Sequence, residues 1–153
     1  EKYCEGVVPG PHARLEIDAL DSADLAAARA AMDGSHGYLC HEALACVTRL
    51  TERANLHIQQ TQPWVLAKDP ANRAKLDETL AALVRSLARQ AAYLAPFMPG
   101  KAEALWTQIG APGTAARTRY DAVESLDASS WRVSKGEGLF PRPEQPPATP
   151  SPS

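Results

Sequence analysis

The sequence has few of the features that mark several protein classes. Its 153 residues include three cysteines, none in a Cys-x-x-Cys pair, which favours a reducing, cytoplasmic setting over a disulfide framework. No uninterrupted apolar run approaches the roughly 20 residues that cross a bilayer, so we expect no contact with a membrane. The first residues also lack the apolar core of a signal peptide. Because the chain does not begin with methionine, we interpret it as a piece of something longer.

Sequence signatures of catalysis and metal binding are absent as well. There is no Gly-x-Gly-x-x-Gly loop and no Walker-type phosphate loop. His36 and Cys40 lie four residues apart, with His41 and Cys46 nearby, but a structural zinc site needs four ligands, usually in paired short loops. A Cys/His nucleophile pair lacks an orienting third group. We therefore predict no catalytic residue, no metal site and no cofactor in this chain.

The net charge of −2 conceals an uneven distribution along the chain. Residues 1–48 carry three Lys/Arg against eight Asp/Glu, whereas residues 49–90 carry seven against four. A field of this size does not mark a general nucleic-acid binder, which usually presents a strongly basic face. The basic middle is compatible with local phosphate contacts, and a solvated helix face is the alternative.

Helical periodicity is the strongest positive signal. Asp21 has the side chain of an N-cap, and apolar residues then recur at three- and four-residue steps between proline and glycine breaks. The expected helices cover residues 21–33, 36–60, 70–95 and 99–109. Arg85 and Arg89 are expected to fall mostly outside the apolar stripe of the third helix. The sequence predicts an all-α fold, an antiparallel helical bundle with an irregular C-terminal segment and a Pro-rich tail.

The segment between the second and third helices is the candidate functional feature. Pro63 closes one helix and Trp64 follows at the corner, where its ring is either a core plug or an exposed stacking platform. On general grounds the plug is favoured. Five basic residues flank the corner in sequence and are suited to phosphate contacts: Arg49, Arg53, Lys68, Arg73 and Lys75. Spacing alone leaves both alternatives open.

Three blocks of residues follow one another along the chain. The first is Ala54-Asn55, Ile58 and the run Gln62-Pro63-Trp64-Val65-Leu66-Ala67-Lys68. The second is Leu94-Ala95-Pro96-Phe97-Met98-Pro99 with Ala102-Glu103 and Leu105-Trp106, and the third is Trp131, Gly136 and Leu139-Phe140-Pro141-Arg142. In order and spacing these blocks resemble the anticodon-binding domain of methionyl-tRNA synthetases, and the resemblance covers roughly residues 1–143. It implies a C-terminal helical domain that binds the anticodon stem-loop of tRNA(Met) beside a catalytic domain that uses ATP and Mg.

The resemblance assigns roles to particular residues. The family's tryptophan at the position of Trp64 packs against an anticodon base, and the basic residues Arg53, Lys68 and Arg73 would hold the loop backbone. Asn55 matches a position that is structural as much as RNA-facing. The same resemblance divides the chain into 1–20 (the end of a preceding helix and a connector), 21–143 (the anticodon-binding domain with its closing segment) and 144–153 (a Pro/Ser-rich tail or linker).

The chain also departs from the family pattern. The family reads the anticodon with an Asn and an Arg on a helix before the connector, and the sequence begins after that helix. Gln59 and Gln62 replace a frequent acidic residue and a frequent lysine. The catalytic signatures and the zinc-knuckle cysteines have no counterpart. Two alternatives therefore remain: a stand-alone helical adaptor that binds a protein partner, or the anticodon domain of another class I synthetase.

Overall fold

The computed structural model describes residues 3–34 and 37–141, and it is helical throughout most of that range. The four longest helices are α1 (Glu16–Met32), α2 (Cys40–Thr61), α4 (Arg73–Leu94) and α5 (Pro99–Gln108). Short helical turns make up α3 (Pro63–Leu66), η1 (Pro70–Asn72), η2 (Ala115–Arg117) and α6 (Tyr120–Glu124). The described residues contain a single isolated β-bridge and no strand, which confirms the all-α prediction. The predicted tail, 144–153, lies outside the described residues, as do His36 and Arg142.

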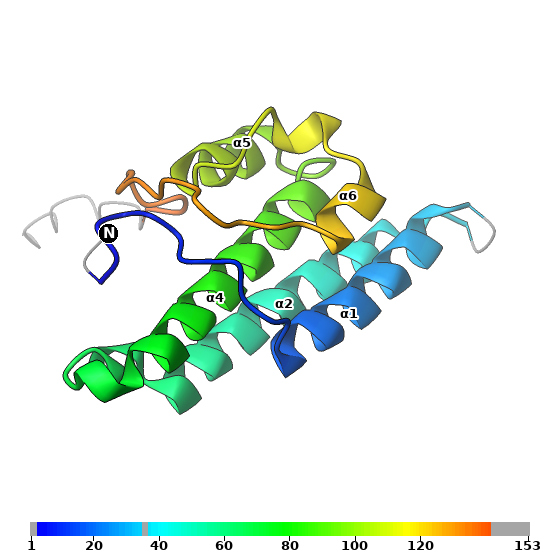
Figure 1. Cartoon of the computed structure of the whole chain (residues 1–153). Coiled ribbons are helices and arrows are strands. Elements are labelled where there is room, and N and C mark those ends of the chain that lie inside the picture. The colour runs from blue at the N-terminus through cyan, green and yellow to red at the C-terminus, as the bar shows by residue number, and fades with distance from the viewer. Residues whose placement is uncertain (1–2, 35–36, 142–153) are drawn as a thin grey trace, which may run out of the picture.

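The long helices α1, α2 and α4 lie side by side, and each runs antiparallel to the next in the chain (Figure 1). The shorter helices α5 and α6 pack against α4. Buried apolar side chains from all these helices form one core, with Leu25, Leu50, Ala91, Trp106 and Val123 almost inaccessible to solvent. The predicted antiparallel helical bundle is therefore confirmed.

Helix α1 begins five residues earlier than predicted. The backbone N–H of Leu15 donates to the Asp18 carboxylate at 2.9 Å, which satisfies a free donor at the helix start. Glu16 and Asp18 also place negative charge in the first turn, where the helix dipole favours it. Asp21, which the sequence predicted as the N-cap, is instead buried inside the helix. Helix α2 starts at Cys40, four residues later than predicted.

Two other predicted helix boundaries are confirmed in chemical detail. The Asp69 carboxylate accepts the Ala71 N–H at 2.9 Å, although the chain makes the turn η1 before α4 begins. Gly110 follows α5 with φ of +71°, a conformation that favours glycine. A Cβ at this position would lie 2.2 Å from the backbone oxygen of Arg132, so close packing also requires glycine there.

Two irregular segments, residues 3–15 and 125–141, run beside each other along α4 (Figure 1). The Val8 N–H donates to the Trp131 oxygen at 2.9 Å, and the Val133 N–H donates to the Gly6 oxygen at 2.7 Å. The Trp131 ring lies 6.2 Å from the ring of Trp106, whose Nε1 donates to the Pro112 oxygen. These contacts join the irregular C-terminal segment to the helical core.

Candidate functional site

The chain turns sharply between α2 and α4, and the backbone of Gln62 makes the turn. Gln62 has a left-handed conformation, with φ of 46°, while its N–H still donates to the Ile58 oxygen at 2.9 Å. Pro63 then starts α3, where its missing N–H costs no hydrogen bond. Pro63 and Leu66 are buried, so they anchor α3 to the bundle.

The two residues between these anchors face solvent. The Trp64 residue is 49% exposed and its neighbour Val65 is 45% exposed. Trp64 is therefore not the core plug that general grounds favoured. A large aromatic ring held half-exposed on a fixed backbone has the geometry of a stacking platform. We call residues 62–68 the corner.

Three of the other predicted site residues are also accessible. Lys68 is exposed at the end of the corner and forms no salt bridge within the described part of the chain. Asn55 is exposed on α2. Arg73 is exposed at the start of α4, but its Nε lies 2.9 Å from the Asp77 carboxylate and its Nη1 donates to the Tyr3 oxygen at 3.2 Å.

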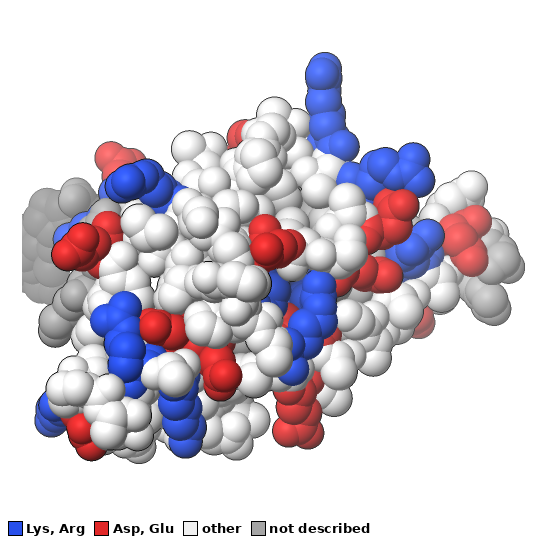
Figure 2. Space-filling view, viewed as in Figure 1, with Lys and Arg blue, Asp and Glu red and all other residues white. Residues whose placement is uncertain are grey.

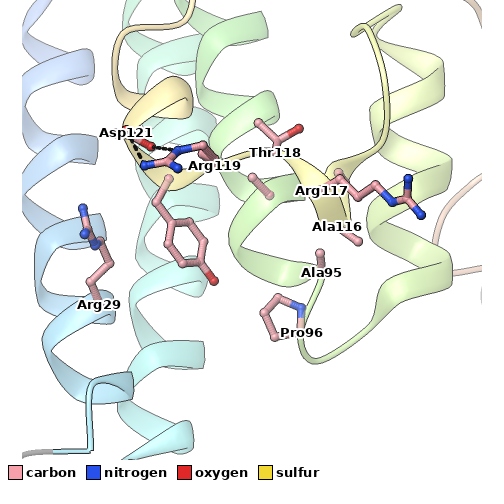
Figure 3. Close-up of a pocket in the computed structure, with 11 residues that line it drawn as sticks. Arg29, Ala95, Pro96, Ala116, Arg117, Thr118, Arg119 and Asp121 are labelled. Atoms are coloured by element: carbon pink, nitrogen blue, oxygen red, sulfur yellow. Dashed lines mark hydrogen bonds and ion pairs between the residues drawn. The ribbon is translucent and has the colours of Figure 1, made fainter.

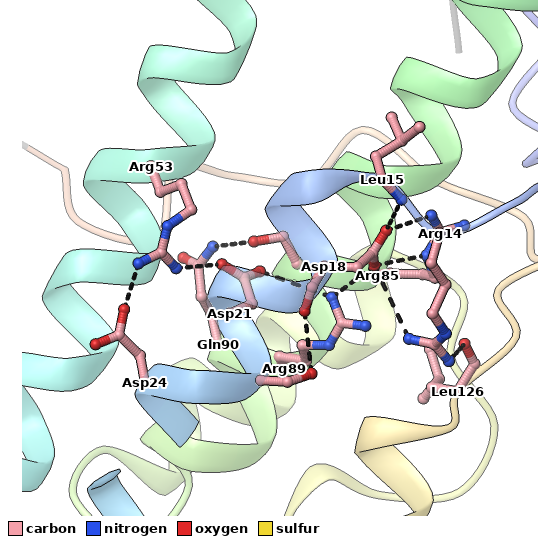
Figure 4. Close-up of polar contacts among 12 residues, drawn as sticks. Arg14, Leu15, Asp18, Asp21, Asp24, Arg53, Arg85, Arg89, Gln90 and Leu126 are labelled. Atoms are coloured by element: carbon pink, nitrogen blue, oxygen red, sulfur yellow. Dashed lines mark hydrogen bonds and ion pairs between the residues drawn. The ribbon is translucent and has the colours of Figure 1, made fainter. Parts of the chain in front are cut away.

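Arg53 lies differently from the prediction of a phosphate contact. Its side chain is only 20% exposed and points toward α1. Nη1 is 2.6 Å from the Asp21 carboxylate, and Nη2 donates to the Asp24 carboxylate (Figure 4). The guanidinium of Arg53 is therefore held inside the protein by two carboxylates.

Arg53 is one part of a larger ionic network, whose centre is Asp18 (Figure 4). The Asp18 carboxylate accepts from Arg85 Nε at 2.9 Å, Arg85 Nη2 at 2.7 Å and Arg89 Nη1 at 2.8 Å. Asp18, Arg85 and Arg89 are all buried. The prediction that Arg85 and Arg89 lie away from the buried face of α4 is therefore wrong, because α1 supplies the counterions that allow their burial.

The pKa of Asp18 reflects these contacts. Burial by itself would raise the pKa, but hydrogen bonds from Arg85, the Leu15 N–H and Arg89 lower it from 3.8 to about 2. At Asp21 burial outweighs the hydrogen bonds from Ser86 and Arg53, so the pKa of Asp21 is raised. Asp18 is thus charged at all pH values above the acid range, and its arginine partners remain paired.

This pKa shift predicts how stability depends on pH. Between 3.8 and about 2, a proton binds Asp18 in the unfolded chain before it binds Asp18 in the folded chain. The contribution of Asp18 to the free energy of unfolding should therefore be fully present above 3.8 and decline as the pH falls toward 2. Urea unfolding across this range measures the decline, which should be steeper than in Asp18→Asn. Parallel pH profiles for the two proteins would contradict the assignment.

The same network explains the uneven charge of the sequence. Four of the seven basic residues in 49–90 pair with aspartates of α1: Arg49, Arg53, Arg85 and Arg89. On the face shown in Figure 2, positive and negative side chains intermingle and do not gather into a patch of one sign. On this face the basic middle of the sequence therefore does not become a basic surface. The signal that sequence reasoning missed is the matching spacing of Asp18, Asp21 and Asp24 on one helix and arginine pairs four residues apart on two others.

A pocket of about 550 Å³ lies away from the corner, between the end of α4, Arg29 of α1 and residues 115–121 (Figure 3). Two of its three arginines lie near carboxylates: Arg119 forms two hydrogen bonds with Asp121, at 3.1 and 3.2 Å, and Arg29 lies 4.0 Å from Glu124. Figure 3 also shows Arg117 pointing away from Arg29, so these cations do not converge on one point. None of the predicted site residues lines this pocket.

The described residues form neither a metal-binding cluster nor a membrane-spanning helix. Residues 3–34 and 37–141 contain no group of three or more His, Cys, Asp or Glu side chains arranged to hold a metal ion. Within the same ranges, no helix has the length and apolar character needed to cross a bilayer.

Comparison with known proteins identifies relatives of the chain. No family model matches the sequence. The methionine--tRNA ligase of Caldanaerobacter subterraneus subsp. tengcongensis is 34% identical over 144 residues, which is 93% of this chain and 22% of that enzyme. The methionine--tRNA ligase of Clostridium acetobutylicum is 36% identical over 149 residues, with the same coverage. The chain thus spans about a fifth of the length of these curated relatives.

Solved structures agree with the sequence comparison. The crystal structure of the free methionyl-tRNA synthetase from Mycobacterium tuberculosis superposes with a TM-score of 0.78 and 26% identity. The match covers 95% of this chain and 30% of that one. Sequence, fold and coverage together show that this chain is homologous, along nearly its whole length, to one helical segment of the methionine--tRNA ligases.

Proposed function

We propose that this chain is the anticodon-binding, C-terminal portion of a methionine--tRNA ligase and that it binds the anticodon stem-loop of tRNA(Met). The observation that carries the proposal is the half-exposed Trp64 on a backbone anchored by buried Pro63 and Leu66. An unstacked base on such a ring contributes roughly 1–3 kcal/mol to binding. The homology to methionine--tRNA ligases supports tRNA(Met) as the RNA in this proposal.

The exposed side chains around Trp64 have distinct roles in this proposal. Trp64 stacks on an anticodon base, while Lys68 and Arg73 contact backbone phosphates. Asn55, exposed on α2, offers an amide to the same loop. Arg53 supports the site from inside, because its pairing with Asp21 and Asp24 holds α2 against α1.

The chemistry of methionine attachment belongs to another part of the parent enzyme in this proposal. ATP and Mg would bind a catalytic domain joined to this chain, and the enzyme would act in the cytoplasm. Supporting this division, the chain covers only 22% of each of the relatives described above. The role of the present segment is to position tRNA(Met) on that catalytic domain.

A binding titration tests the proposal. The 153-residue chain is titrated into a labelled tRNA(Met) anticodon stem-loop, and into the same stem-loop with an altered anticodon, at one fixed salt concentration. The methionine stem-loop should bind about tenfold more tightly or better, since one wrong base costs roughly 1–3 kcal/mol. Equal binding of both RNAs would contradict anticodon reading, and no binding of either would favour a protein-binding adaptor.

A further inference from the structure

A groove opens next to the corner because α1 is shorter than its neighbours. Figure 1 shows the end of α2 and the start of α4 extending beyond the first turn of α1. Where α1 begins, the three helices enclose a groove of about 470 Å³. The α2 residues that line it include Gln60 and Thr61, so the groove reaches the end of α2, where the corner starts.

The groove has apolar walls that no other part of the described chain covers. Leu20 of α1 is 45% exposed and Leu56 of α2 is 52% exposed, and both line the groove. They are the two exposed leucines among the large hydrophobic side chains of the described residues. A planar ligand with apolar faces would remove both from water.

Polar groups complete the lining of the groove. His57 lines it, and its Nε2 is buried with no hydrogen-bond partner among the described residues. Burial lowers the pKa of His57, which favours the neutral imidazole. Lys75 is exposed on the α4 side and forms no salt bridge within the described residues. Arg53 lines the groove as well, but its guanidinium is already paired with Asp21 and Asp24. With Glu16 and Glu78 beside Lys75, the groove favours a neutral group that offers amino donors over an anion.

From this combination we propose that the groove receives a second unpaired nucleobase of the RNA that binds the corner. The proposal rests on the proposed function. A base has apolar faces for Leu20 and Leu56 and a polar edge for His57 and the two carboxylates. The adjoining phosphates would contact Lys75, which lines the groove, and Lys68, which is exposed in the corner. Trp64 and the groove would then hold two splayed bases of one loop.

The test uses the full chain, the tRNA(Met) stem-loop and a double variant, Leu20→Ala with Leu56→Ala. Both leucines are exposed and alanine favours helices, so the variant should keep its fold. Its affinity for the stem-loop should fall about tenfold, since burial of two partly exposed leucines contributes on this scale. Tyr38→Ala removes another exposed apolar side chain from the described loop before α2 and should leave the affinity unchanged.

A series of stem-loops, each with one abasic loop nucleotide, locates the second base. One abasic position should weaken binding of the wild-type chain about tenfold but have no further effect on the double variant. A different abasic position should weaken binding of the wild-type chain but have no further effect on Trp64→Ala. If RNA binding depends on Trp64 but not on Leu20 and Leu56, the groove proposal is overturned and the proposed function stands. That result is expected if a protein segment, and not a base, occupies the groove. No binding by the wild-type chain would overturn the proposed function itself.

Discussion

Asp18→Asn should lower the free energy of unfolding by about 3–5 kcal/mol, the range found when one partner of a buried ion pair is removed. The substitution preserves shape but removes the charge that both Arg85 and Arg89 require. It also weakens the cap on the Leu15 N–H at the start of α1. Because a domain of this size is stable by only about 5–15 kcal/mol, the loss would be a large fraction of the total. Urea unfolding monitored by circular dichroism gives the value.

The matched control is Asp121→Asn. Asp121 also accepts two hydrogen bonds from an arginine, Arg119, but both side chains are exposed. Water replaces such a pair readily, so no measurable change in unfolding is expected. If Asp18→Asn were as stable as Asp121→Asn, the buried network would have no role in stability.

The second large effect is expected at the corner, where Trp64→Ala should weaken binding of the tRNA(Met) stem-loop at least tenfold. The ring is half-exposed and its removal leaves Pro63 and Leu66 as anchors, so the loss should reflect stacking and not unfolding. Fluorescence anisotropy with labelled stem-loop measures the affinity, and circular dichroism checks the helices. In a full-length enzyme that carries this segment, tRNA charging should fall sharply while methionine activation is unchanged.

Val65→Ala provides the control for this experiment. Val65 follows Trp64 on the same short helix and is exposed to a similar degree, 45% against 49%. It lacks a ring, so its removal should change RNA affinity little, whereas Trp64→Phe should retain part of the binding. Equal affinities for Trp64→Ala and the wild-type chain would exclude Trp64 as the platform.

The sequence was sufficient to predict the bundle because its helices are marked by strong local signals. Leucine spacing, Pro63 and Pro96 mark α2 and α4, and Gly110 ends the helix of α5 as predicted. The start of α1 could not be read in the same way. Asp18 and Asp21 both have capping side chains, and the choice between them depends on Arg85 and Arg89, which are more than 60 residues away in the chain.

The candidate site shows the same division. The corner was recognisable because proline followed by tryptophan between two helices is a local pattern. The exposure of the Trp64 ring could not be recognised in the sequence, since it depends on how Pro63 and Leu66 pack in three dimensions. The pairing of Arg53 with Asp21 and Asp24 likewise depends on how α1 packs against α2. From its charge alone, Arg53 was predicted to contact RNA. The tRNA-binding roles of Trp64, Asn55, Lys68, Arg53 and Arg73 stay predictions.

The ionic network also limits how far the protein can be reduced to a minimal fragment. The corner lies entirely between α2 and α4, so a two-helix hairpin of residues 40–94 would include every residue of it. In that hairpin, however, Arg53, Arg85 and Arg89 would lose the three aspartates of α1 that neutralise them. An excised hairpin would therefore carry unpaired cations along its apolar face, and a peptide mimic of the corner would need α1 or neutral replacements at these arginines.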